Sequence, residues 1–289
     1  MNGTRQSVIG VLVFVGLWAV VEALAGRLLV EYSPYQIVWT RYAVHLLFML
    51  VVWGWREPLA LVRTERLGFQ LSRSMLMLVM PASWTIGMQA GLDGRTLMSV
   101  FWLSPLLVMA IAWMFLKERV SPALWLAGSA AFVGTLLLMG WGGFASLQLL
   151  IFPIAMALSF SAYVVMTRSL RTDTSLANLF YTALGVFLVL TPFMPSVWIT
   201  PTFHDMIVLA GIGILGFFTL FGLDRMAAAA PVSKTAPLLA LQPVFYIIIE
   251  LLRGNSHTRL QIGIGILVVL AAVFVAMWRT PTVAPRGAG

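Results

Sequence analysis

The chain has 289 residues, of which 61% are hydrophobic and 10% are charged, and it contains no cysteine. Soluble domains carry about a quarter charged residues, so this composition predicts a membrane protein. The net charge of +8 is better explained by Lys- and Arg-rich cytoplasmic loops than by a nucleic-acid partner. The lack of cysteine excludes disulfides, thiolate chemistry and cysteine-ligated metal centres.

Apolar segments of about 20 residues, the length that crosses a bilayer, recur between short polar breaks. They predict an all-α membrane protein with ten transmembrane helices, at residues 7–30, 34–54, 69–90, 96–116, 122–141, 148–167, 175–194, 204–222, 234–252 and 260–278. The first segment is longer than the apolar core of a signal peptide, so we interpret it as a span. The third is expected to be irregular, because Arg73 lies one turn inside it and Pro81 interrupts it.

Basic residues are distributed unevenly between the two sets of loops. One set, together with both termini, holds thirteen of the 18 Lys and Arg residues, the other set holds four, and Arg41 lies inside a span. Cytoplasmic loops are enriched in Lys and Arg, so both termini are predicted to lie in the cytoplasm. Residues 281–289 are expected to form a disordered cytoplasmic tail.

The two halves of the chain also resemble each other. At an offset of 136–138 residues, Pro105-Leu-Leu matches Pro243-Val-Phe, and Leu124, Gly128, Gly134 and Trp141 match Leu260, Gly265, Ala271 and Trp278. A weaker match relates Trp39-Thr40 to Tyr181-Thr182. Five spans per half is an odd number, so the halves are predicted to insert in opposite orientations, as an N-terminal repeat over residues 1–145 and a C-terminal repeat over 146–280.

These segments resemble the drug/metabolite transporter superfamily, in particular its ten-span EamA-type permeases. The most specific stretch runs from Leu103-Ser-Pro-Leu-Leu to Phe115-Leu-Lys-Glu-Arg-Val-Ser, a proline-centred fourth span that ends in a Glu-Arg turn. Leu241-Gln-Pro-Val-Phe fits as its counterpart in the second half, but Arg253-Gly-Asn-Ser replaces the Glu-Arg turn. Trp18 and Arg41 also resemble positions that the family often fills alike.

The resemblance implies a multi-pass protein of the bacterial inner membrane that needs no cofactor and moves amino acids, nucleotide-related metabolites, amines or drugs. It further implies that spans one to four and six to nine surround the pathway. Spans five and ten are then expected to lie outside it as support.

Ionisable residues inside the spans are the first candidates for the mechanism, because each costs about 2.5–3.5 kcal/mol at a helix centre on insertion scales. Glu22 and Arg41 are predicted to lie at the same depth on adjacent spans, with His45 one turn beyond Arg41 on the same face. One interpretation is a buried structural ion pair between Glu22 and Arg41. The other interpretation is that Glu22 binds a cationic group of the substrate or a coupling proton. Both interpretations remain open for Glu22. For Arg41 the structural role is favoured.

Aromatic and polar side chains complete the candidate site. Trp18 lies one turn before Glu22, so a ring and a carboxylate can face one amine. The other candidates for substrate contact are Trp39, Trp84, Trp102, Tyr163, Tyr181 and Gln242. For each ring, contact with lipid or packing between helices is the commoner explanation.

Two further groups of residues were singled out at helix ends and helix contacts. Lys117, Glu118 and Arg119 end the fourth span and are predicted to form a solvated cap or an inner gate contact. Glycines are expected to let helices approach closely; they are Gly87, Gly91, Gly211, Gly213 and Gly216.

Recognised enzyme motifs are missing from the sequence: it has no Walker loop, no Gly-x-Ser-x-Gly elbow and no dinucleotide fingerprint, and its three histidines are scattered. An enzyme, a bound metal and an ATP-driven pump are therefore not expected.

The leading prediction is a secondary transporter, exporter or exchanger, of amino acids or of zwitterionic or cationic amines, working by alternating access. The alternatives are a flippase or exporter of lipid-linked or drug-like aromatic molecules, and a non-transporting sensor or enzyme. Besides substrate and lipid, protons and a second copy of the chain remain open as partners.

Overall fold

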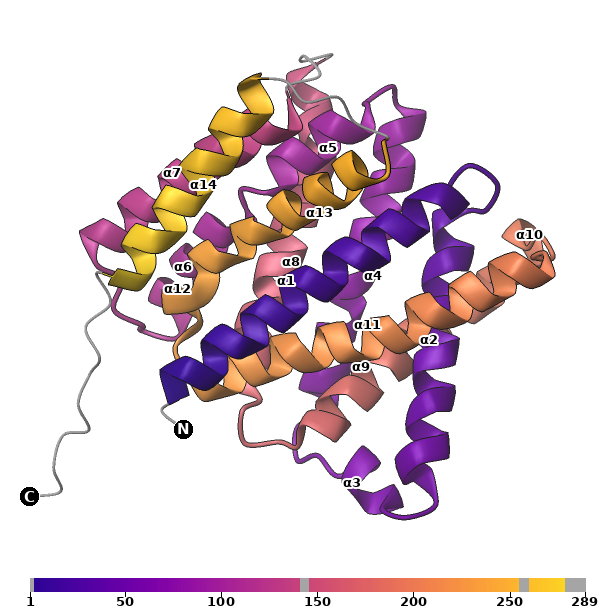
Figure 1. The fold of residues 1–289 in the computed structure, drawn as a ribbon. Coiled ribbons are helices and arrows are strands. Elements are labelled where there is room, and N and C mark those ends of the chain that lie inside the picture. The colour runs from indigo at the N-terminus through magenta and orange to yellow at the C-terminus, as the bar shows by residue number, and fades with distance from the viewer. Residues whose placement is uncertain (1–2, 141–145, 255–259, 279–289) are drawn as a thin grey trace, which may run out of the picture.

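The computed structural model describes residues 3–140, 146–254 and 260–278, and within these ranges the chain is helical and contains no strand (Figure 1). The helices are α1 (Gly3–Leu28), α2 (Pro34–Met49), α3 (Pro58–Val62), α4 (Leu67–Gln89), α5 (Gly94–Phe101), α6 (Ser104–Phe115), α7 (Pro122–Met139), α8 (Ile151–Ser169), α9 (Ser175–Leu190), α10 (Met194–Val197), α11 (Phe203–Ala229), α12 (Val232–Thr235), α13 (Leu241–Leu252) and α14 (Leu260–Trp278). The predicted tail and the boundary between the predicted repeats lie outside the described residues.

Each predicted span coincides with one helix or with consecutive helices, which confirms the all-helical membrane architecture. Nine segments of the described ranges are long and apolar enough to cross a bilayer. The third predicted span, α4, is 23 residues long but lies outside this set, because Gln70, Ser72 and Arg73 lower its mean hydropathy. A count of ten spans therefore stays a prediction. α4 continues through Pro81 as one helix from Leu67 to Gln89, so the proline does not end the span.

Two spans are broken near their middle, and both breaks precede a proline. α5 ends at Phe101 and α6 begins at Ser104, directly before Pro105. In the second half a 3₁₀ turn over Ala236–Ala240 leads into α13, in which Gln242 precedes Pro243. Proline fits the first turn of a helix because the backbone N–H there has no partner within the helix. The sequence thus sets both breaks and places a polar side chain at each.

The main contacts join helices of the first half to helices of the second half. α1 lies along α11, α4 along α8, α2 along α9 and α7 along α14, while α6 contacts α8 and α13 contacts α1. Figure 1 shows α7 and α14 side by side at one edge of the bundle. By span order, α1 of the first half corresponds to α8 of the second, α4 to α11 and α6 to α13. When each helix is replaced by its counterpart, the α1–α11 contact becomes the α8–α4 contact, and the α6–α8 contact becomes the α13–α1 contact. These contacts are all present, so the same contacts are made by both halves.

Close helix contacts use two of the predicted glycines on α11. An added Cβ at Gly213 or Gly216 would collide with α2, which confirms their role in close packing. Gly211 faces open space, so its predicted role is wrong. Gly91 has a φ of +95° and ends the turn after α4, a conformation that glycine adopts without strain.

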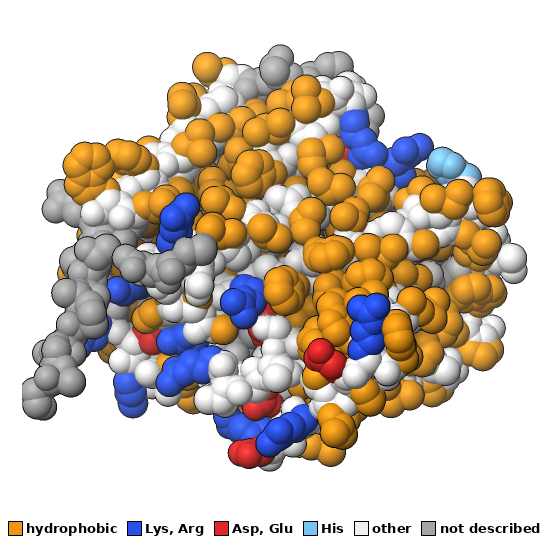
Figure 2. Space-filling model, turned by 60° about the horizontal axis from the view of Figure 1, so that its bottom comes forward, with side chains coloured by type: hydrophobic (Ala, Val, Ile, Leu, Met, Phe, Trp, Pro, Cys, Tyr) orange, Lys and Arg blue, Asp and Glu red, His pale blue; other side chains and the backbone are white. Residues whose placement is uncertain are grey.

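The surface is mainly apolar. Large side chains such as Trp113, Phe115 and Phe203 are more than half exposed, as expected for helices that face lipid. Figure 2 shows hydrophobic side chains over much of one face, with Lys and Arg gathered over its lower part. We call the end of the bundle at which α1 begins the proximal end, and the end at which α1 finishes the distal end.

Candidate functional site

A cavity of about 180 Å³ lies between α1, α2 and α4. Two charged side chains, Glu22 and Arg41, and two rings, Trp18 and Trp84, contribute to its wall. The rest of the lining is apolar: Val21, Ala25, Leu29, Pro34, Ile37, Val38, Met80, Pro81, Met98 and Ile212. Since Leu29 follows the end of α1 and Pro34 begins α2, the cavity extends from Trp18 toward the distal end.

Glu22 is held by an amide and not by a cation. Its carboxylate accepts a hydrogen bond from Nε2 of Gln242, which α13 supplies from the break in its span. No ion pair joins Glu22 to Arg41 within the described ranges, so the predicted ion pair between these two residues is not formed. The Oε1 atom of Gln242 is buried and has no hydrogen-bond partner.

Arg41 places its guanidinium beside the same cavity, and no ion pair with it is found among the described residues. Its Nε atom is buried without a hydrogen-bond partner, and its guanidinium carbon lies 5.4 Å from the centre of the Tyr42 ring. Gly216 of α11 leaves the room for it, because a Cβ at that position would lie 2.6 Å from Nε of Arg41. The guanidinium is thus placed beside the cavity by a close helix contact.

Trp18 connects this cavity to a second one that lies deeper in the bundle. The second cavity, of about 90 Å³, is also lined by Trp18 and Arg41 and reaches Phe14, Phe160 and Thr219. Trp102 is fully buried behind Trp18, with ring centres 5.5 Å apart, and it lines neither cavity. It supports the ring of Trp18 and does not face the cavity.

His45 lies apart from the cavity, so the expectation that it acts with Glu22 is not supported. The imidazole is fully buried, packs edge-on against Phe217 with ring centres 5.2 Å apart, and has no hydrogen-bond partner on either nitrogen. Trp39 donates to the Thr191 hydroxyl over 3.0 Å and stacks on Phe187. Both residues therefore serve packing between α2 and the second half of the chain.

A buried polar network at the proximal end was missed by the sequence analysis. Arg73 is 1% exposed and donates to the Thr167 hydroxyl over 2.9 Å, the Gln70 amide oxygen over 2.9 Å, the Asn178 carbonyl over 2.6 Å and the Thr182 hydroxyl over 2.9 Å. Asn178 in turn donates to the Asp224 carboxylate over 2.8 Å. These contacts join α4 of the first half to α8 and α9 of the second, and they join α9 to α11.

Two predicted aromatic residues belong to this end of the molecule. The Tyr163 hydroxyl lies 3.2 Å from the Thr182 hydroxyl, and the guanidinium of Arg73 lies 4.9 Å from the centre of the Tyr163 ring. The Tyr181 hydroxyl donates to the Val62 carbonyl over 2.8 Å. Neither tyrosine lines the distal cavity.

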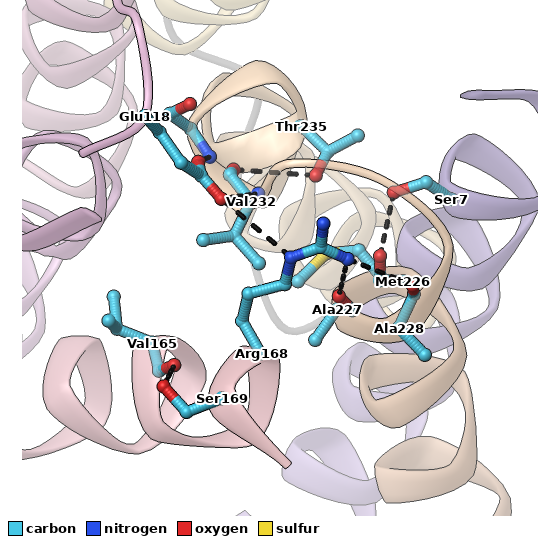
Figure 3. A network of polar contacts seen from close by, with 11 residues as sticks. Ser7, Glu118, Val165, Arg168, Ser169, Met226, Ala227, Ala228, Val232 and Thr235 are labelled. Atoms are coloured by element: carbon cyan, nitrogen blue, oxygen red, sulfur yellow. Dashed lines mark hydrogen bonds and ion pairs between the residues drawn. The ribbon is translucent and has the colours of Figure 1, made fainter. Parts of the chain in front are cut away.

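A second polar network closes the proximal end on its other side (Figure 3). The Glu118 carboxylate accepts the backbone N–H groups of Val232 over 3.2 Å and Ser233 over 2.9 Å, and it lies 3.8 Å from Nε of Arg168. Arg168 also donates to the carbonyls of Ala227 and Ala228 at the end of α11, each over 2.8 Å. Of the three residues predicted at the end of span four, Glu118 makes these contacts, whereas Lys117 and Arg119 are exposed.

The distal end is tied by fewer polar contacts. The Gln36 amide both donates to the Ile199 carbonyl over 2.6 Å and accepts its N–H over 2.9 Å. The Tyr32 hydroxyl donates to the Asp205 carboxylate over 2.8 Å, and this hydrogen bond raises the pKa of Tyr32 above its usual value. Arg253, at the end of α13, also donates to the Ala23 carbonyl of α1 over 2.8 Å. Charged groups thus act at both ends, but the distal end is joined by fewer hydrogen bonds.

Comparison with known proteins agrees with this architecture. Residues 6–140 match the EamA-like transporter family. This part of the chain, which lies within the predicted N-terminal repeat, is similar to an EamA-like transporter domain. This match confirms the resemblance to the drug/metabolite transporter superfamily that the sequence motifs indicated.

Three relatives extend the comparison. The chain is 27% identical over 186 residues to an S-adenosylmethionine uptake transporter of Rickettsia bellii, a match that covers 63% of each protein, less than two thirds of the relative. It is 23% identical over 286 residues to a riboflavin transporter of Vibrio cholerae, covering 91% of this chain and 93% of the relative. It is 25% identical over 277 residues to the protein RarD of Streptomyces exfoliatus. The family and two of these names point to a transporter and not to an enzyme.

A solved crystal structure shares the fold. It is 16% identical in sequence, has a TM-score of 0.80 and is matched over 96% of both chains. Identity at this level supports the fold alone.

Proposed function

We propose that this EamA-like chain is a secondary transporter of a small organic metabolite that carries a cationic or zwitterionic group beside a flat ring. The observation that carries the proposal is the distal cavity, in which Glu22 and Arg41 face the same space without pairing with each other, next to Trp18 and Trp84. An amine of the substrate bonds to Glu22, an anionic group bonds to Arg41, and the rings cover the remaining apolar part.

The charges support this assignment because both are costly in a membrane. An ionised side chain inside a span is retained where it serves a pathway or a partner. Glu22 has an amide as its partner, and the buried Nε of Arg41 has none. A zwitterionic ligand satisfies both groups at once, which a purely apolar cargo does not.

The named relatives are consistent with a ring-bearing cargo. Their names refer to S-adenosylmethionine uptake and to riboflavin, two solutes that each contain a fused ring. S-adenosylmethionine also carries an amine, a carboxylate and a sulfonium, which match Glu22, Arg41 and the aromatic face of Trp18 by charge. Amino acids and simple amines fill less of the cavity and stay in the candidate set.

We further propose ten spans arranged as an inverted repeat with both termini in the cytoplasm, in a bacterial inner membrane. The exchange of contacts between the halves supports the repeat, and the packing of α4 against α8 and α9 supports its inclusion as the third span, because its polar residues face protein. The excess of Lys and Arg in the proximal loops supports the orientation. In this arrangement the cavity reaches the outer side, and Glu118 contributes to a closed inner side.

Ligand-induced stabilisation of the purified protein tests the proposal. Melting temperatures are measured with a panel that contains S-adenosylmethionine, riboflavin, amino acids, polyamines and aromatic drug-like cations. A ligand at one hundred times its dissociation constant stabilises the folded state by about 2.7 kcal/mol. We expect one class of the panel to stabilise the protein, and this effect to disappear in Glu22→Gln but to persist in Glu57→Gln, which changes an exposed glutamate at the proximal end. Stabilisation by apolar or lipid-like compounds that is unchanged in Glu22→Gln would instead favour the flippase alternative.

A further inference from the structure

The segments that begin α2 and α9 are related by sequence and lie at opposite ends of the molecule. Residues 31–41 read EYSPYQIVWTR and residues 173–183 read DTSLANLFYTA. Aligned without a gap, they place Glu31 with Asp173, Ser33 with Ser175, Gln36 with Asn178, Trp39 with Tyr181 and Thr40 with Thr182. The two copies of one duplicated segment therefore lie at opposite ends of the bundle.

Each copy bonds to the half of the chain that does not contain it. At the distal end, Gln36 of the first half forms two hydrogen bonds with Ile199 of the second. At the proximal end, Asn178 of the second half accepts from Gln70 of the first over 2.6 Å, and Asp173 accepts from Gln70 over 3.1 Å. Both ends are thus tied across the interface between the halves by equivalent residues.

Arg73 strengthens one of the two ties. Three of its hydrogen bonds cross to the second half, to the Thr167 hydroxyl, the Asn178 carbonyl and the Thr182 hydroxyl. The fourth goes to Gln70 on the same helix. Matched segments of the two halves are offset by 136–142 residues, and residues 209–215 on α11, which these offsets relate to Arg73, include no Lys or Arg. Thr40, the counterpart of Thr182, has a buried hydroxyl without a hydrogen-bond partner. The distal contact between Gln36 and Ile199 therefore has no equivalent of the Arg73 guanidinium or of its hydrogen bonds.

We infer that Arg73 is a positioning residue that holds the proximal gate shut and makes the distal-open form the favoured state of the empty transporter. The inference rests on the proposed function for its meaning in transport. Hydrogen bonds to a charged donor are stronger than those between neutral groups, so the contacts of Arg73 at the proximal end are harder to break than the neutral contact between Gln36 and Ile199, their counterpart at the distal end. The distal cavity that Glu22 and Arg41 line agrees with this preference. Opening the proximal end requires Arg73 to exchange its three acceptors on the second half for water.

The absence of native cysteine allows a direct test on the protein alone. Val186 is fully buried on α9, one turn farther from the proximal end than Thr182, whereas Val38 lines the distal cavity. The rate at which a water-soluble maleimide labels Val186→Cys reports opening of the proximal end. The labelling rate of Val38→Cys reports access from the distal end.

In the Arg73→Gln background we expect Val186→Cys to react about tenfold faster, which corresponds to about 1.4 kcal/mol in the gate equilibrium, and Val38→Cys to react more slowly. Thr182→Val removes one acceptor of Arg73 with little change in volume and should move both rates in the same directions by a smaller factor. Thr40→Val is its matched control at the distal end and should leave both rates unchanged.

Unchanged labelling of Val186→Cys in both Arg73→Gln and Thr182→Val would overturn the inference, as would an equal response to Thr40→Val. Size-exclusion profiles and melting curves of each variant separate gate opening from unfolding, because unfolded protein exposes Val186→Cys and Val38→Cys alike. The test uses no substrate, so its outcome is independent of the ligand screen.

Discussion

Glu22 and Arg41 line one cavity yet are not paired, since Glu22 accepts a hydrogen bond from Gln242 and the buried Nε of Arg41 has no partner. A buried ion pair would neutralise both charges and leave nothing for a ligand to bind. The separation keeps one anionic and one cationic group available. Gln242 is therefore central, because it satisfies the carboxylate without cancelling its charge.

The contact between Gln242 and Glu22 should appear as a coupling energy. Gln242→Leu leaves the Glu22 carboxylate without its donor and is expected to lower the free energy of unfolding by about 1–3 kcal/mol. In the Glu22→Leu background the same substitution should cost less, because no carboxylate is left unpaired. A double-mutant cycle from denaturant unfolding measures the difference. Additive effects of the two substitutions would contradict the contact.

Gly216 should be needed to place Arg41. A Cβ at this position would lie 2.6 Å from Nε of Arg41, so Gly216→Ala should displace the guanidinium and destabilise the protein by about 1–3 kcal/mol through overpacking. Gly211→Ala is the matched control on the same helix, since its Cβ meets open space, and alanine there favours the helix. Thermal unfolding checks both variants. Equal effects would show that helix propensity, and not the approach of α2 and α11, governs these sites.

Arg168 should contribute to stability through its contacts at the proximal end. Arg168→Met removes the hydrogen bonds to the Ala227 and Ala228 carbonyls and the ion pair with Glu118, and should cost about 1–3 kcal/mol. Arg171→Met changes an exposed arginine two residues beyond α8 and is expected to lie within about 0.5 kcal/mol of the parent protein. The measurement is the urea midpoint of each variant in detergent. A similar shift in both would mean that net charge is responsible.

The stability of the protein at alkaline pH should depend on the hydrogen bond between Tyr32 and Asp205 at the distal end. Its hydrogen bond to Asp205 raises the pKa of the hydroxyl in the folded state, so the folded state binds the proton more tightly than the unfolded state does. The contribution of Tyr32 is therefore fully present below its unfolded pKa of about 10 and is lost as the pH rises through the folded value. Tyr32→Phe should remove this component of the alkaline loss of stability. The test is to measure the melting temperatures of both proteins from pH 8 to 11, which spans roughly one to two units on either side of the unfolded tyrosine pKa. Identical pH profiles of Tyr32→Phe and the parent protein would refute the prediction.

The sequence predicted the helices well because apolar length and polar breaks determine them directly. It also brought Trp18, Glu22 and Arg41 to one site, since depth within a span follows from counting residues from its end. Trp39, Trp102 and His45 lie outside both cavities, in agreement with the packing role that was the commoner expectation for the rings. Residue depth alone does not reveal which face of a helix meets the cavity. Contacts with neighbouring helices decide that face.

The proximal network was missed for a different reason. The sequence places Arg73 one turn inside the third predicted span, yet it is one of the thirteen basic residues counted with the loops, and the predicted eighth span ends at residue 222, which leaves Asp224 outside it. α11 continues to Ala229, so Asp224 lies inside a helix and is 5% exposed. Gln70, Asn178 and Thr182 are polar residues in the first turns of their helices, and their clustering at one end of the bundle was the available signal.

Uptake into liposomes tests the central claim most directly. The purified protein is reconstituted, loaded with the compound that stabilises it most, and assayed for saturable exchange of the same labelled compound. We predict exchange in the parent protein and in Glu57→Gln, and its loss in Glu22→Gln with the melting temperature of the empty protein preserved. Equal exchange in Glu22→Gln and the parent protein would contradict the account of the cavity, and no saturable exchange of any stabilising compound would contradict the assignment as a transporter.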